Sequence, residues 1–162
     1  MEPIIIYTDG GCRGNPGPGG WAYIIKAGRK QVSCSPMQPE TESIEKSRSG
    51  GDSYTTNNKM ELTAVIRSLE AVLKDSELST RGIELHTDSQ YVKNGISSWI
   101  KNWIRNGWIT AAKKPVKNKE LWIELKEVSD KLNVTWKWVK GHAGDPLNEA
   151  CDRMVGEEMS KL

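Results

Sequence analysis

Four acidic residues are the first candidates for chemistry in this sequence. They are far apart along the chain, and each stands beside a predicted strand or inside a predicted helix: Asp9, Glu61, Asp88 and Asp152. Carboxylates that lie together without a compensating charge repel one another and raise one another's pKa. A hard divalent cation, which prefers oxygen ligands, relieves that repulsion. If the chain brings the four acids together, the sequence predicts a metal site.

Each acid also has an alternative structural explanation, and taken singly none of the four establishes a site. Asp9 could cap a turn, and Asp88 could be the N-cap of the helix that follows it. Glu61 lies three residues after Asn58, which is the spacing of a capping box at the start of a helix. Asp152 could be a solvated helix residue. The joint placement of the four acids is therefore what favours a metal site.

The apolar pattern of the sequence predicts five strands and five helices. We expect strands over 4–8, 21–26, 43–50, 83–87 and 134–139, where apolar runs or alternation end near Gly or Asp. We expect helices over 58–74, 89–94, 97–105, 121–132 and 146–159, the last opened by Asp145 as N-cap and Pro146. Residues 14–20 are rich in Gly and Pro and predict a turn, and the polar residues 33–41 predict a surface loop.

This order of elements predicts an α/β fold with a five-stranded mixed sheet flanked by helices. The first three strands form an antiparallel meander, and right-handed crossovers make strands one, four and five parallel. If strands one and four are neighbours, Asp9 and Asp88 lie side by side at their carboxyl ends. Glu61 is expected in the first turn of a helix that begins at the same edge, and Asp152 about two turns into the last helix. Open α/β sheets bind ligands at this edge.

Positive charge is concentrated in one segment, although the net charge of the chain is only +2. Residues 89–119 contain no Asp or Glu, and their basic residues are Lys93, Lys101, Arg105, Lys113, Lys114, Lys117 and Lys119. Trp99, Trp103, Trp108 and Trp122 lie in this segment or just beyond it. Such a segment can neutralise phosphates and stack on bases or sugars. A solvated basic face over a Trp-rich core explains the same pattern.

Length and composition exclude several classes of protein. A chain of 162 residues with 36% apolar and 27% charged residues is typical of one globular domain, here 1–162. No apolar run approaches the roughly 20 residues of a membrane helix, and the N-terminus lacks the basic region of a signal peptide. Cys12, Cys34 and Cys151 form no zinc-binding spacing, which favours a reduced, cytoplasmic chain. We expect a monomer, since no oligomerisation surface is evident.

Seven motifs follow one another along almost the whole chain. They are YTDGGC at 7–12, GNPGPGG at 14–20, TTNNKMEL at 55–62, TDSQYV at 87–92, KKPVKN at 113–118, WVKGHAG at 138–144 and NEACD at 148–152. Together they resemble the type 1 ribonuclease H family, in its bacterial form with a single catalytic domain. The resemblance implies the ribonuclease H-like fold, with the five-stranded mixed sheet predicted above.

The resemblance also implies an activity, which is endonucleolytic cleavage of the RNA strand of an RNA–DNA hybrid with 3′-hydroxyl and 5′-phosphate ends. It assigns the four acids as ligands of two Mg²⁺ ions, with Mn²⁺ able to substitute. It makes His142, between Gly141 and Gly144, a proton shuttle or an aid to product release. An imidazole with a pKa near about 6.5 suits that task at neutral pH. His86, the other histidine, lies in a predicted strand and is interpreted as structural.

The same matching implies two sets of substrate contacts. Asn15, Asn57, Asn58 and Gln90 would follow the minor groove of the hybrid, where amides can bind the 2′-hydroxyl. Thr56 and Asn118 would hold a phosphate of the DNA strand, and Trp99, Lys113, Lys114, Lys117 and Lys119 would belong to a basic protrusion that grips that strand.

The chain departs from the family pattern in two places. Residues 29–49 are longer than the usual connection, and Tyr54 stands where an Arg is frequent beside the phosphate pocket. Two other functions stay open at this stage, a hybrid-binding module without catalysis and a metal-dependent nuclease acting on DNA. The complete acid set disfavours the first, and the amide residues disfavour the second.

Overall fold

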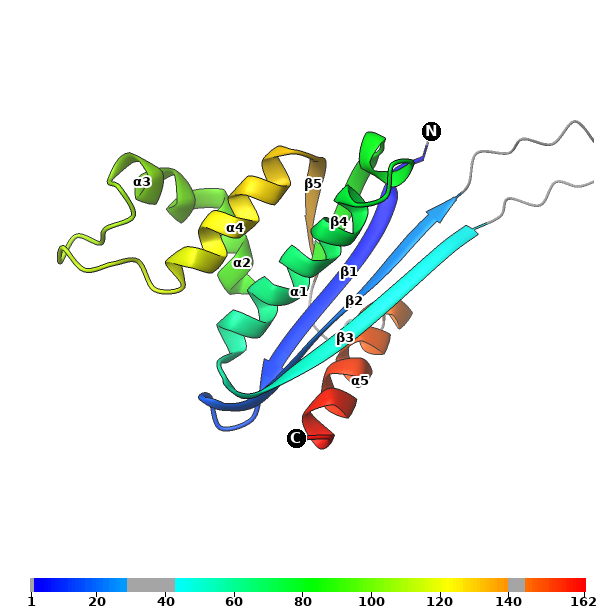
Figure 1. Cartoon of the computed structure of the whole chain (residues 1–162), viewed down its shortest axis with the longest axis horizontal. Helices are drawn as coiled ribbons and strands as arrows, with labels where there is room; N and C mark the ends of the chain where they lie inside the picture. The colour runs from blue at the N-terminus through cyan, green and yellow to red at the C-terminus, as the bar shows by residue number, and fades with distance from the viewer. Residues whose placement is uncertain (1, 29–42, 140–144) are drawn as a thin grey trace, which may run out of the picture.

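The computed structural model describes residues 2–28, 43–139 and 145–162. Its strands are β1 (Ile4–Cys12), β2 (Gly17–Gly28), β3 (Ser43–Thr55), β4 (Gly82–Thr87) and β5 (Asn133–Trp138). Its helices are α1 (Asn57–Leu73), the 3₁₀ turn η1 (Leu78–Thr80), α2 (Gln90–Asn94), the π-helical turn η2 (Gly95–Trp99), α3 (Ile100–Arg105), α4 (Lys119–Asp130) and α5 (Pro146–Ser160). Figure 1 shows their arrangement.

The sheet confirms the predicted topology. Its strand order is β3-β2-β1-β4-β5. β1 pairs antiparallel with β2, and β2 antiparallel with β3. β1 pairs parallel with β4, and β4 parallel with β5. The carboxyl ends of β1 and β4 are therefore neighbours.

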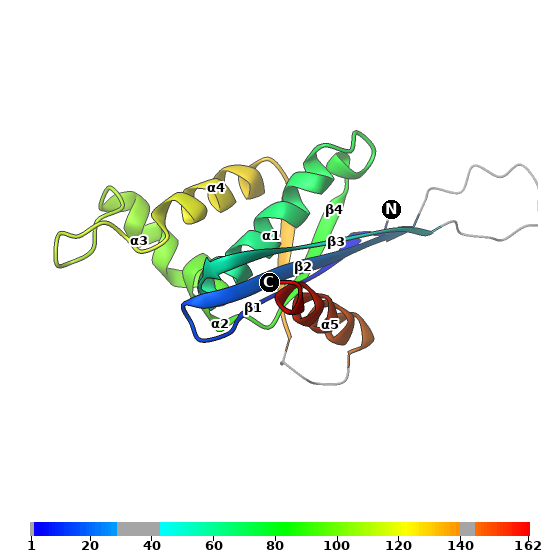
Figure 2. The ribbon, with the colours of Figure 1, turned by 60° about the horizontal axis from the view of Figure 1, so that its bottom comes forward.

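Helices cover the two faces of the sheet unequally (Figure 2). α1 and α4 pack on one face, where the larger apolar core contains residues such as Leu62, Leu85 and the fully buried Trp122. α5 lies on the other face, over β1, β2 and β3, around the smaller cluster of Tyr7, Ala22, Ile24, Cys151 and Val155. Among the described residues, no helix combines the length and the apolar character needed to span a membrane.

The strands extend further toward the Gly- and Pro-rich segment than predicted. β1 continues to Cys12 and β2 begins at Gly17, so part of the turn predicted over 14–20 is paired strand. The reason is close packing, because a Cβ on Gly19 would lie 2.5 Å from Thr55 Cγ2 and 2.8 Å from the Gly11 carbonyl oxygen. Glycine at this position fits a crowded ladder instead of marking a turn. β3 likewise continues beyond the predicted end at residue 50 to Thr55.

Two helix starts differ from the predictions in a way that concerns the acids. The N-cap of α1 is Thr56, whose hydroxyl accepts from the Lys59 amide at 3.3 Å, so the predicted N-cap role of Asn58 is wrong. Glu61 is therefore the fifth residue of α1, not part of a capping box or of the first turn. The N-cap of α2 is Ser89, not Asp88. The hydroxyls of Thr56 and Ser89 already cap α1 and α2. Glu61 and Asp88 are therefore left to other contacts.

The remaining helices lie close to their predicted ranges. Asp145 is the N-cap of α5 and Pro146 its first residue, as predicted. α4 begins at Lys119, two residues early, and the segment predicted as one helix over 97–105 is a π-helical turn followed by α3. The loop predicted over 33–41 and the segment with His142 lie outside the described residues.

Candidate active site

The neighbouring ends of β1 and β4 bring Asp9 and Asp88 together. The last residue pair in the ladder is Tyr7 with His86, and the two acids follow two residues later on each strand. Burial, followed by the charges of Asp88 and Asp152, raises the pKa of Asp9 to about 8. The Gly10 amide opposes this rise by hydrogen bonding, while a hydrogen bond with Asp152 favours the protonated form of Asp9. Three carboxylates from β1, β4 and α5 thus interact.

Glu61 joins the group because α1 passes unusually close to β1. A Cβ on Gly10 would lie 2.4 Å from the Met60 carbonyl carbon and 2.5 Å from the Glu61 amide nitrogen, so only glycine allows this approach. Burial raises the pKa of Glu61 to about 7, and Asp88 adds to the rise. The Ser89 hydroxyl donates to Glu61 Oε2 and opposes it. All four predicted acids therefore converge on one edge of the sheet.

This donor set fits a hard divalent cation. All four side chains offer oxygen ligands, and two of them bind protons more tightly than isolated carboxyls because they are buried beside like charges. Within the described ranges, no three His, Cys, Asp or Glu side chains already surround one point as a metal cage. The contacts at this edge instead include those of Asp9 with Asp152 and of Ser89 with Glu61. A cation at this edge would replace a shared proton and attract carboxylates that now repel.

The predicted amide residues lie beside this edge, at the junction of the β1–β2 turn and α1. Asn15 Oδ1 accepts from the Asn57 amide at 3.0 Å, so the turn and the helix start are joined directly. Thr56 caps the helix between them, and Asn58 is half-buried in its first turn. Gln90 is exposed at the start of α2, directly after Ser89.

The Trp residues of the basic segment divide into core and surface. Trp122 is fully buried in the main core, whereas Trp99 is 37% exposed and contacts Tyr91 and Trp103 by its ring. Trp103 and Trp108 pack against the core and are half-buried. Trp99 is thus the most exposed of the four.

The predicted phosphate contacts lie near the start of α4. Lys113, Lys114 and Lys117 are exposed, and Lys119 is half-buried. Asn118 donates from Nδ2 to the Tyr91 hydroxyl at 3.2 Å, and the Trp122 indole donates to the same oxygen at 2.9 Å. A groove of about 590 Å³ runs between the starts of α1 and α4, lined by Lys59, Pro115, Val116, Asn118, Lys119, Glu120 and Leu121.

The family of the chain follows from its similarity to known proteins. The ribonuclease H family matches residues 1–160. The chain belongs to the ribonuclease H family. It is 50% identical over 169 residues to a ribonuclease H of Treponema denticola, covering 98% of each protein. It is 46% identical over 162 residues to a ribonuclease H of Hydrogenovibrio crunogenus, covering 100% of this chain and 99% of the relative.

Solved structures agree with this ribonuclease H assignment and confirm the fold. LC9-RNase H1, described as a type 1 RNase H with the type 2 active-site motif, is 26% identical with a TM-score of 0.81, over 99% of this chain and 74% of that one. LC11-RNase H1, solved in complex with an RNA/DNA hybrid, is 25% identical with a TM-score of 0.67, over 98% of this chain and 97% of that one. The resemblance to type 1 ribonuclease H seen in the sequence motifs is confirmed.

Three residues near the site of this ribonuclease H chain were not singled out by the sequence analysis. Ser89 binds Glu61 and also accepts from the Val92 amide at 3.1 Å, so one hydroxyl both caps α2 and orients an acid. Tyr91 orients Asn118. Tyr7 contacts the start of α5. A serine at a predicted helix start signals a cap, but its second contact follows only from how α1 packs against β1 and α2.

Proposed function

We propose that this chain is an endoribonuclease that hydrolyses the RNA strand of RNA–DNA hybrids and leaves 3′-hydroxyl and 5′-phosphate ends. Membership of the ribonuclease H family supports this, and LC11-RNase H1 was solved with an RNA/DNA hybrid. The observation that carries the proposal is the convergence of four carboxylates, with the pKa of Asp9 raised to about 8 and that of Glu61 to about 7. A fold that needed only affinity for a polyanion would gain nothing from clustered negative charge.

Two Mg²⁺ ions would be held by the four acids, with Mn²⁺ able to substitute, and when bound they would supply Lewis-acid chemistry for in-line displacement at phosphorus. The chain's own contribution is to orient the ligands. Ser89 fixes one oxygen of Glu61. His142 is proposed to move a proton at the reaction centre or to assist product release.

Recognition of the hybrid is proposed to divide between two surfaces. Asn15, Asn57, Asn58 and Gln90 lie beside the acids and would bind sugars and base edges in the minor groove. Thr56 and Asn118 would hold one DNA-strand phosphate, and Trp99, Lys113, Lys114, Lys117 and Lys119 would bind the strand further along. We also propose that the protein is a single-domain monomer of the cytoplasm.

A single assay tests the reaction. Labelled RNA–DNA hybrid, double-stranded RNA and double-stranded DNA are each incubated with Mg²⁺ and with a chelator. Cleavage confined to the RNA of the hybrid and abolished by the chelator is the expected result. Binding of the hybrid without cleavage would indicate a binding module, and cleavage of double-stranded DNA would indicate a DNA nuclease; either outcome contradicts the proposal.

The basic segment has a separate test. Replacing Lys113, Lys114, Lys117 and Lys119 with Ala should raise KM much more than it lowers kcat, because the acids are untouched. The slope of log affinity against log salt should also shrink, by somewhat less than the roughly 0.9 per phosphate seen with duplex DNA. Steady-state kinetics at several salt concentrations measure both. An unchanged salt slope would remove this segment from the substrate-binding surface.

A further inference from the structure

α5 packs on β1 and β2 through the smaller apolar cluster and through close approaches to glycines. The helix rests partly on glycines, since a Cβ on Gly20 would lie 2.9 Å from the Val155 carbonyl oxygen and one on Gly11 3.3 Å from Val155 Cγ1. Directional contacts act together with this packing to set where α5 lies, and with it where Asp152 lies.

One such contact joins the start of α5 to the central strand. The Tyr7 hydroxyl donates to Asp145 Oδ2 at 2.5 Å, and Asp145 Oδ1 accepts from the Leu147 amide at 3.0 Å. The same carboxylate therefore caps the helix and fastens it to β1. Burial and Asp145 raise the pKa of Tyr7 to about 12, so the hydroxyl keeps its proton at neutral pH.

The Tyr7 ring is itself held in place by the next strand. β1 and β4 pair Tyr7 with His86 in register, and the two rings stack with centroids 4.6 Å apart and planes inclined by 14°. The Cys151 thiol of α5 approaches the Tyr7 carbonyl oxygen at 3.5 Å. Stacking on His86 thus orients the Tyr7 ring, and Cys151 joins α5 to the backbone of the same residue.

Tyr7 and Asp9 are two residues apart in β1, so their side chains point to the same face of the sheet. α5 meets that face twice, with Asp145 at Tyr7 and, about two turns later, Asp152 at Asp9. We propose that Tyr7, through Asp145, is a positioning residue that sets α5 along β1 and so places Asp152 beside Asp9 for metal binding. This inference rests on the proposed function.

Tyr7→Phe tests the inference because it removes the hydroxyl and keeps the stacked ring. Its kcat should fall about tenfold and its half-saturating Mg²⁺ concentration should rise about tenfold, as is typical when a partner of a metal ligand is lost. KM for the hybrid should stay within about twofold, since Tyr7 is buried beneath α5 and its hydroxyl is bound to Asp145. Tyr23→Phe is the matched control, because it makes the same deletion in the main core and should change none of these values.

A second readout needs no activity. Mg²⁺ should raise the Tm of the substrate-free wild type, because a ligand that binds only the folded state stabilises it. That rise should shrink in Tyr7→Phe and in Asp145→Ser, which keeps an N-cap oxygen and loses the acceptor for Tyr7. The double variant should bind Mg²⁺ no more weakly than either single variant.

The outcomes separate the two proposals. A wild type with neither Mg²⁺-dependent cleavage nor a Mg²⁺-dependent rise in Tm would contradict the proposed function. A wild type with both, beside Tyr7→Phe and Asp145→Ser variants with unchanged Mg²⁺ dependence, would overturn the positioning role alone. A variant that loses stability but keeps the wild-type response to Mg²⁺ would show that the hydrogen bond is only structural.

Discussion

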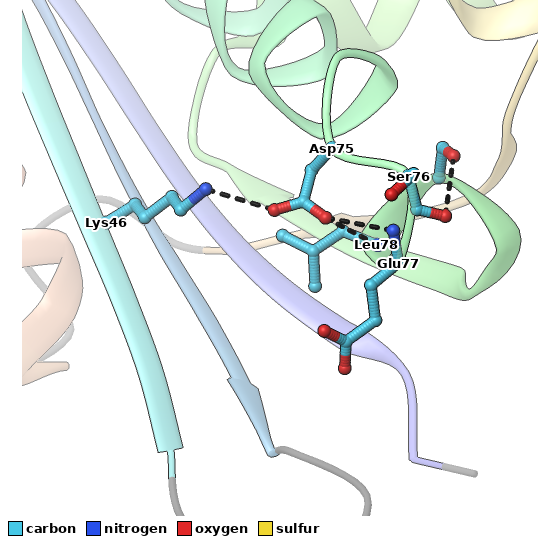
Figure 3. Close-up of polar contacts among 6 residues, drawn as sticks. Lys46, Asp75, Ser76, Glu77 and Leu78 are labelled. Carbon is cyan, nitrogen blue, oxygen red and sulfur yellow. Dashed lines mark hydrogen bonds and ion pairs between the residues drawn. The ribbon is translucent and has the colours of Figure 1, made fainter.

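Asp75 and Asp9 are both aspartates close to the ends of elements, yet their surroundings are opposite. Asp75 follows α1, and its Oδ1 accepts from the Glu77 and Leu78 amides at 3.0 and 3.1 Å. Its Oδ2 accepts from Lys46 Nζ of β3 at 3.1 Å (Figure 3). These hydrogen bonds, led by that of Leu78, hold the pKa of Asp75 below its ordinary value.

The carboxylate edge has the reverse arrangement, since burial and neighbouring carboxylates raise the pKa of Asp9 to about 8. The comparison shows that the surroundings of an aspartate decide whether its charge is stabilised, as in Asp75, or destabilised, as in Asp9. A carboxylate satisfied by amides and an ammonium fastens β3 to the loop after α1. Carboxylates placed against one another reduce the stability of the fold without metal and would favour binding of a cation. Breaking each region should therefore have opposite consequences.

The largest effect is expected at the carboxylate edge. Asp9→Asn should abolish cleavage, a greater loss than the roughly 10–100-fold typical of residues that only support a metal ligand. The fold should be retained, because the amide is isosteric with the carboxyl group and cannot acquire a repelling charge. Initial rates on the labelled hybrid, with circular dichroism as the control for folding, measure this. Substantial Mg²⁺-dependent turnover by the purified variant would contradict the site.

His142→Ala tests whether the acids suffice on their own. The kcat should fall roughly 10–10⁴-fold, because positioned proton transfer is typically worth about 10²–10⁴ and product release can limit part of the rate. Affinity for the hybrid should change little. If affinity is lost while kcat is preserved, His142 is a binding residue.

The two regions should also respond oppositely to pH. Asp9 and Glu61 have folded-state pKa values of about 8 and 7, above those of the unfolded chain. Their protonated forms favour folding, so without divalent cations stability should fall as pH rises from about 4 through 8. Urea unfolding in chelator at pH 5 and pH 8.5 measures this. Asp9→Asn should show a smaller fall than the wild type, and an equal fall would mean that Asp9 is not the cause.

The smallest effect is expected at Asp75. Asp75→Ala should lower the free energy of unfolding by about 1 kcal/mol, the typical cost of losing a side-chain cap, with little added for an exposed ion pair. Because the folded-state pKa is lowered, this contribution is present above about pH 4 and is lost as the acid protonates below that. The kcat should equal that of the wild type. A loss of activity would contradict this prediction and show that the contacts of Asp75 affect the carboxylate edge.

Much of the architecture could be predicted because local patterns and connection rules leave few alternatives. The apolar runs before Asp9 and Asp88 indicate strands, and right-handed crossovers make those strands parallel neighbours, as the structure confirms. Asp145 and Pro146 open α5 where predicted, since a cap and a proline act within one turn. The sequence thus determined the strand order, and that order brings Asp9 and Asp88 to one edge.

Tertiary structure alone decided which residues cap the helices and which side chains form hydrogen bonds with one another. Thr56 and Asn58 are both suitable caps by residue type, and the chain's path out of β3 selects Thr56. Gly10 and Gly19 look like turn residues, yet both lie in strands where another segment approaches too closely for a side chain. The contacts of Ser89 with Glu61 and of Tyr7 with Asp145 join residues 28 and 138 positions apart. Such contacts depend on how helices pack on the sheet, and no local pattern carries that information.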